Sequence, residues 1–120
     1  MAGIVTKNFD KADETRTPPN AKLDVVDLGA HKAFRMTAHP GWHWSESIKP
    51  IAGTDTCQAR HVGTVVAGHL HVVHDDGTEV DLVPGGAYVI EPGHDAWVVG
   101  DEPFVACEFE ASTAATYAKS

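Results

Sequence analysis

Five histidines and one cysteine fall between residues 53 and 97, and side chains of these two types are common zinc ligands. The whole chain of 120 residues carries eight histidines and two cysteines. A local supply of imidazole is compatible with metal binding, although histidine is also common on protein surfaces. The count alone does not say which of these side chains meet.

Short strands must position these residues. Apolar and β-branched runs recur every 8 to 10 residues, and turn residues such as Asp76-Gly77 separate them. We expect strands over 22–28, 32–37, 41–45, 61–67, 69–73, 79–83, 87–90, 95–99 and 104–109. This spacing is typical of an all-β sandwich or barrel.

The chain divides into one domain and two flanking segments, because 120 residues suit a single core. Residues 1–20 are polar and without amphipathic period, which predicts a flexible N-terminal arm. The predicted strands lie within residues 21–110. Residues 111–120 form a C-terminal tail, whose alanine-rich run over 111–119 predicts a short helix or a frayed end.

Composition argues against several classes of protein. The formal net charge of −8 leaves no basic stripe for nucleic acid or an anionic membrane. No apolar run approaches the roughly 20 residues needed to cross a bilayer, and the N-terminus has no signal-peptide core. We therefore expect a cytoplasmic protein without nucleic-acid or membrane partners, in which Cys57 and Cys107 are free thiols.

The arrangement of glycines and turns between residues 55 and 97 resembles the cupin superfamily. In that family, the first motif places two histidines and a glutamate between glycines, and the second places a third histidine after a glycine-rich turn. Here Gly68 matches the last glycine of the first motif, and Gly85 and Gly93 match glycines of the second. The segments GWHWSE, GTDTCQARH and PGHDAWVVGDEP are similar to short bacterial single-domain cupins. The resemblance implies a jelly-roll barrel, also called a double-stranded β-helix, with one divalent metal inside.

The ligand positions of this frame carry other residue types. Asp55 and Cys57 stand in place of the two histidines of the first motif, and His61 stands in place of its glutamate. The place of the third histidine holds Ala96, but His94 lies two residues earlier and faces the same side of an extended strand. By this resemblance we expect Cys57, His61 and His94 to bind one divalent ion, with Asp55 as a fourth, harder ligand.

A mixture of sulfur, nitrogen and oxygen donors favours zinc, and iron, nickel or manganese remain alternatives. A bound ion would activate water or polarise a substrate oxygen. The structural alternative is that Cys57 is a small buried apolar residue, that His61 is a hydrogen-bonded core histidine, and that His94 shapes a turn.

Aromatic residues and further histidines bear on a ligand pocket. Trp42 and Trp44 share one face of the expected strand, and with Trp97 they either line a substrate pocket or, more commonly, pack in a core or a dimer interface. His69 and His71 form a His-x-His sequence, but the glycine that the first motif would require after it is missing. We expect these two histidines to face solvent.

Glu46, Glu91 and Glu108 are the acid–base candidates. Glu108 lies in a late strand, on the same face as Phe104, so it faces either solvent or a polar barrel interior. We favour a solvated strand face because acidic side chains are mostly exposed.

Several functions remain open from the sequence. The first is a metalloenzyme acting on a small polar metabolite, by isomerisation, hydrolysis, lyase chemistry or use of dioxygen. The second is a non-catalytic small-molecule-binding or sensor cupin without a catalytic metal, and a structural or partner-binding domain ranks last. The resemblance also implies a homodimer, in which the N-terminal arm would add a strand to a neighbour's sheet.

Overall fold

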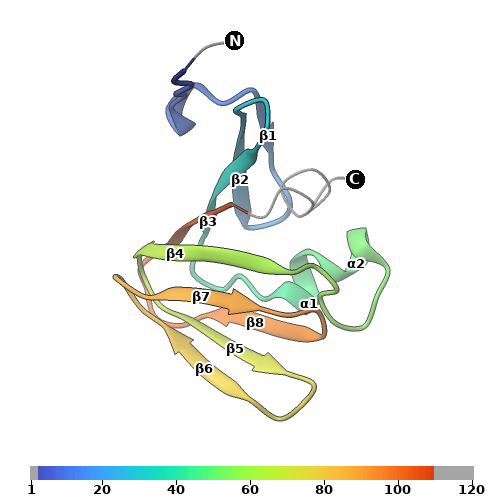
Figure 1. The fold of residues 1–120 in the computed structure, drawn as a ribbon. Coiled ribbons are helices and arrows are strands. Elements are labelled where there is room, and N and C mark those ends of the chain that lie inside the picture. The colour runs from blue at the N-terminus through green and yellow to red at the C-terminus, as the bar shows by residue number, and fades with distance from the viewer. Residues whose placement is uncertain (1–2, 110–120) are drawn as a thin grey trace.

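Two antiparallel β-sheets make up the fold of this computed structural model, which describes residues 3–109 (Figure 1). The larger sheet has the strand order β1-β2-β3-β9-β4-β7, and the smaller sheet has the order β6-β5-β8. The strands are β1 (Glu14–Arg16), β2 (Ala21–Asp27), β3 (Lys32–Ala38), β4 (His61–Ala67), β5 (Leu70–His74), β6 (Glu79–Leu82), β7 (Ala87–Ile90), β8 (His94–Val98) and β9 (Phe104–Glu108). The edge strands β6 and β7 are not paired with each other, so the sandwich is not closed by hydrogen bonds there.

The predicted all-β fold is confirmed. The strands expected over 61–67 and 87–90 have those bounds, and the other strands from β2 to β9 differ from the predicted ranges by a single residue at one or both ends. At the predicted hairpin turn between β5 and β6, Gly77 has a φ of 94°, a backbone conformation that glycine adopts without strain.

Two short helices lie within residues 44–52, where the sequence predicted the end of a strand over 41–45. The chain forms α1 (Trp44–Ser47) and α2 (Lys49–Ala52), and Gly53 ends the second helix in the left-handed conformation. The predicted strand over 41–45 is therefore wrong, because the chain turns into a helix directly after His43. None of the helices within residues 3–109 is long and apolar enough to cross a membrane.

Part of the expected N-terminal arm is ordered. A 3₁₀ helix, η1 (Phe9–Lys11), precedes β1, and β1 pairs with β2 of the same chain. The prediction of an arm without regular structure is thus wrong for these residues, since β1 has the sequence Glu-Thr-Arg and no apolar residue whose alternation could have indicated a strand. Arg16 of β1 is buried and pairs with Glu14 at 2.8 Å. The helix expected over 111–119 lies outside the described residues.

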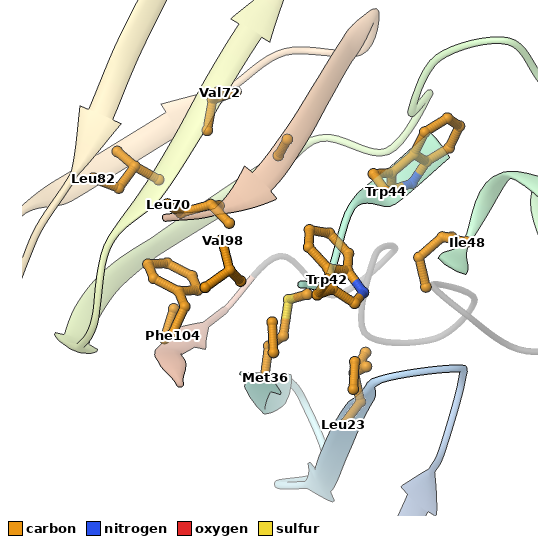
Figure 2. Close-up of a cluster of buried hydrophobic side chains, with 14 of the residues drawn as sticks. Leu23, Met36, Trp42, Trp44, Ile48, Leu70, Val72, Leu82, Val98 and Phe104 are labelled. Atoms are coloured by element: carbon orange, nitrogen blue, oxygen red, sulfur yellow. The ribbon is translucent and has the colours of Figure 1, made fainter. Parts of the chain in front are cut away.

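Apolar side chains from both sheets and from α1 fill the space between the layers (Figure 2). The largest of them are Trp42, Trp44, Phe34 and Phe104. Each fully buried large apolar side chain stabilises the fold by roughly 1.5–3 kcal/mol. This core fixes the inner face of β4 and β8, from which the candidate site is built.

Candidate metal centre

Cys57, His61 and His94 converge in the interior. Their ligand atoms all lie within 4.8 Å of one another, and the residues are only 2%, 5% and 3% exposed. The Cys57 Sγ lies 3.5 Å from the His61 Nε2, and the two imidazole rings meet edge to face with centroids 5.1 Å apart. A tetrahedral zinc ion with ordinary bond lengths holds a sulfur and a nitrogen about 3.5 Å apart. The separation of Cys57 and His61 therefore matches that of two zinc ligands, and the third donor lies within 4.8 Å of both.

Backbone contacts bring the three residues together from both sheets. His61 is the first residue of β4 in the larger sheet, and His94 is the first residue of β8 in the smaller sheet. Cys57 lies in the loop before β4, and its backbone N–H donates to the carbonyl of His94 at 2.7 Å. This loop is thereby tied to β8, which brings the thiol close to both imidazoles.

Each imidazole has one ring nitrogen held by an acceptor. The Nδ1–H of His94 donates to the backbone carbonyl of Glu91 at 2.8 Å, and the Nδ1–H of His61 donates to the Glu108 carboxylate at 2.6 Å. Because Nδ1 carries the hydrogen in both rings, Nε2 is the nitrogen available to an ion. Metal-ligating histidines usually have this arrangement.

Neighbouring charges favour the thiolate form of Cys57. Burial raises the pKa of this thiol, but hydrogen bonding to His61 and His94 outweighs burial and lowers the pKa to about 6 from an ordinary value of 9.0. Burial lowers the pKa of His61, whereas the Glu108 charge and the bond to Cys57 raise it to about 10, so an ion binding at Nε2 would displace a proton from that nitrogen. The thiolate is the form of cysteine that binds metal.

A cavity of about 30 Å³ adjoins the two histidines. One water needs roughly 10–15 Å³ of such volume, so the cavity has room for about two waters or a ligand of a few atoms. Besides His61 and His94, its polar wall consists of Tyr88 and Glu108, and most of the remaining wall is apolar. An ion held by three ligands would thus face a small space with a mostly apolar wall.

Comparison with known proteins supports the fold. No family model matches the chain, and no curated protein does so either. A protein of unknown function from Rhizobium leguminosarum has a TM-score of 0.65 at 19% identity, over 90% of this chain and 96% of that one. A double-stranded β-helix protein from Klebsiella pneumoniae has a TM-score of 0.57 at 22% identity, over 88% and 83% of the two chains. A cupin-like protein from Thermotoga maritima has a TM-score of 0.54 at 14% identity, over 83% and 74%.

The chain has the cupin fold. The predicted resemblance is thereby confirmed for the architecture. Because these structures are less than 25% identical to this chain, they establish its fold alone, and its chemistry has to be argued from its own residues.

Asp55 lies outside the cluster of ligands. Its side chain is fully exposed and pairs with Lys49 at 3.5 Å. The structure does not support Asp55 as a fourth ligand, because the loop turns Cys57 inward and leaves the residue two positions earlier in solvent. The predicted ligands that the cupin fold does bring together are Cys57, His61 and His94.

The three tryptophans divide between the interior and the outer surface. Trp42 and Trp44 are buried and line the cavity, although they come from a helix start and not from one strand face. Trp97 lies on β8 between inward residues and points to the outer face, where its ring contacts His43 and His71 at 5.1 and 4.9 Å. The prediction that Trp97 lines the substrate pocket is therefore not supported by this cavity.

Glu108 faces the interior, whereas the favoured prediction placed it on a solvated strand face. It is only 4% exposed, and it bonds to His61 and to the hydroxyl of Tyr88. Tyr88 was not among the predicted site residues. The signal that was overlooked is Gly63, an inward position of β4 without a side chain, which leaves space for a buried polar pair. The other acid–base candidates, Glu46 and Glu91, are exposed.

His69 and His71 lie on the outer face of the smaller sheet, as expected. The His69 Nε2 lies 2.8 Å from Asp81, and the two nitrogens of His71 lie 2.9 Å from Asp81 and Glu79. Among residues 3–109, these side chains do not join the group that could hold an ion.

Proposed function

We propose that this protein is a metal-binding cupin that holds one divalent ion through Cys57, His61 and His94. The observation that carries the proposal is the meeting of three buried ligand atoms within 4.8 Å. A thiolate with two imidazoles suits zinc first, with iron, nickel and manganese as alternatives. Three ligands leave one coordination position, and the adjoining cavity supports its use by a small polar metabolite.

When bound, the ion would supply Lewis-acid chemistry to a metabolite or water at that position. The residues of the chain would do the remaining work. The imidazoles of His61 and His94 orient the ligand sphere, and the apolar cavity wall excludes bulk water. The hydroxyl of Tyr88 is a polar group on that wall. It donates a hydrogen bond to Glu108, and its oxygen can accept one from a bound ligand.

Metal content tests this proposal. We would purify the protein without chelators and without a histidine tag, and we would count metal per chain by elemental mass spectrometry. Near-stoichiometric metal is expected in the wild type and in the control His71→Ala, whose imidazole lies on the outer face. Cys57→Ala and His61→Ala should lose it. A wild type that stays metal-free after reloading with Zn²⁺, Fe²⁺, Ni²⁺ and Mn²⁺ would contradict the proposal.

The second candidate is a small-molecule-binding or sensor cupin without a catalytic ion. The observation that favours it concerns Trp42 and Trp44, whose buried indole N–H groups have no hydrogen-bond partner among the described residues. An unsatisfied buried donor costs about 1–3 kcal/mol, which a ligand acceptor would offset. A metal-free protein whose melting temperature rises with one compound of a carboxylate and carbonyl library would support this candidate.

We also propose that the chain forms a homodimer, as its resemblance to cupins implies. β1 is an edge strand of the larger sheet, so one of its sides is open to pairing with a second copy. Light scattering tests this, and a monomer at micromolar concentration would remove the idea.

A further inference from the structure

We propose that Glu108 and Tyr88 form a positioning pair for His61, and that Gly63 provides the space for this pair. The inference rests on the proposed metal site. It assigns a role to a buried carboxylate and a hydroxyl that are not themselves among the three metal donors.

The first argument is the chain of hydrogen bonds. Tyr88 Oη donates to Glu108 Oε2 at 2.8 Å, and Glu108 Oε1 accepts from His61 Nδ1 at 2.6 Å. Both carboxylate oxygens are therefore occupied. A carboxylate is rarely buried unless its oxygens have partners, and here one partner is the far nitrogen of a metal ligand. The chain fixes the ring of His61 with its Nε2 toward Cys57.

The second argument is the register of three neighbouring strands. Gly63 of β4 is the direct partner of Tyr88 on β7 and of Glu108 on β9. The three residues form one row across the inner face, and the hydroxyl meets the carboxylate above the glycine. Side chains two strands apart can touch in this way only when the residue between them is very small.

The third argument is the space at Gly63. A Cβ placed there would lie 2.4 Å from the Cys107 carbonyl oxygen, 2.8 Å from Glu108 Cγ and 3.1 Å from Tyr88 Oη. Gly63 does not have a positive φ, so its backbone conformation does not call for glycine. Glycine is needed here for room, and the atoms that occupy the room include the two polar side chains.

The test compares the metal affinity of Glu108→Gln and Tyr88→Phe with that of the wild type. Glu79→Gln is the matched control, because it removes a carboxylate bonded to an exposed histidine, His71. Zn²⁺ affinity is measured by competition with a chromophoric chelator, and Co²⁺ absorption spectra report the geometry of the ligands. We expect roughly 10–100-fold weaker binding and altered Co²⁺ bands in Glu108→Gln. Tyr88→Phe should show a smaller loss and Glu79→Gln none.

The outcomes separate this inference from the proposed function. A wild type that binds no metal contradicts the function itself. If the wild type binds Zn²⁺ and a folded Glu108→Gln binds it with equal affinity and an unchanged Co²⁺ spectrum, the positioning role is overturned. This holds even if that variant is less stable than the wild type. Should Glu108→Gln fail to fold, Tyr88→Phe decides, since it keeps the ring and removes only the hydroxyl. Unchanged affinity and spectrum in that variant would also overturn the inference.

Discussion

Histidine serves two regions of this molecule, and the regions differ in what each ring nitrogen faces. In the interior, His61 and His94 each donate through Nδ1 to a fixed acceptor, which leaves Nε2 turned toward Cys57 or the adjoining cavity. On the outer face of the smaller sheet, both nitrogens of His71 lie within 2.9 Å of a carboxylate.

This difference separates a candidate metal ligand from a solvated ion pair. A histidine with one nitrogen oriented and the other directed at further donors can bind an ion. A histidine whose two nitrogens both bond to exposed carboxylates directs neither of them at other metal donors, and solvent screens these pairs. Residue type and local abundance do not distinguish the two regions, whereas burial and the second partner of each ring do.

The largest expected effect is stabilisation by metal. Free Zn²⁺ at about a thousand times its Kd should raise the free energy of unfolding of the wild type by about 4 kcal/mol. Cys57→Ser should gain much less, because its alcohol is a poor ligand compared with a thiolate. Urea unfolding with and without Zn²⁺ measures the difference.

His71→Gln is the control for that experiment, because it removes an outer-face imidazole. It should keep the full gain from Zn²⁺. If the increase in the free energy of unfolding with Zn²⁺ fell as much in His71→Gln as in Cys57→Ser, the ion would not be bound in the interior alone. That result would contradict the proposed difference between the two regions.

The next largest effect is the loss of one buried partner. Glu108→Ala should lower the free energy of unfolding of the metal-free protein by about 3 kcal/mol, since it leaves His61 buried without its carboxylate. Glu79→Ala, at a side chain that is 59% exposed, should change stability by less than about 0.5 kcal/mol. Urea titration measures both variants, and equal losses would mean that burial does not distinguish the two carboxylates.

A pH-dependent effect follows from the pKa of Cys57, which is about 6 in the folded protein and 9.0 as its ordinary value. Because the folded pKa is depressed, the thiolate contributes stability that is present above pH 9 and is lost as the pH falls through 6. We expect the stability of the metal-free wild type over Cys57→Ala to grow from about pH 6 to about pH 9. Thermal unfolding at several pH values measures this difference, and a difference that stays constant with pH would contradict it.

Much of the fold could be predicted from sequence because turn residues and alternation are local signals. The strands from β4 to β9 follow glycine and proline turns closely. The helices at residues 44–52 could not be predicted, since the Trp-His-Trp pattern suits a strand and only packing of Trp44 in the core decides against it.

Which face of a strand is buried was harder to predict than where the strand lies. On β9, the outward residues Val105 and Cys107 are as apolar as the inward ones, so alternation alone could not bury Glu108. On β8, the expected inward direction of His94 already implied that Trp97 points outward, because the two residues are three positions apart. The spacing of the cupin motifs predicted Cys57, His61 and His94 as ligands. It also predicted Asp55, whose side chain is exposed because the loop that carries it does not keep the alternation of a strand.

The smallest expected effect lies on the outer face, and its pH dependence has the opposite sign to that of Cys57. Bonds to Asp81 and Glu79 raise the pKa of His71 above its ordinary 6.5, and bonds from His71 and His69 lower the pKa of Asp81. The raised pKa means that His71 contributes stability fully below pH 6.5 and loses it as the pH rises through the folded value. The melting temperature of the wild type should therefore exceed that of His71→Gln more at about pH 5.5 than at about pH 9. Since solvent and salt screen these charges, the difference should shrink at high ionic strength, whereas the buried contribution of Cys57 should persist there. A His71 effect that resisted salt would show that the outer face is not the solvated region that its geometry indicates.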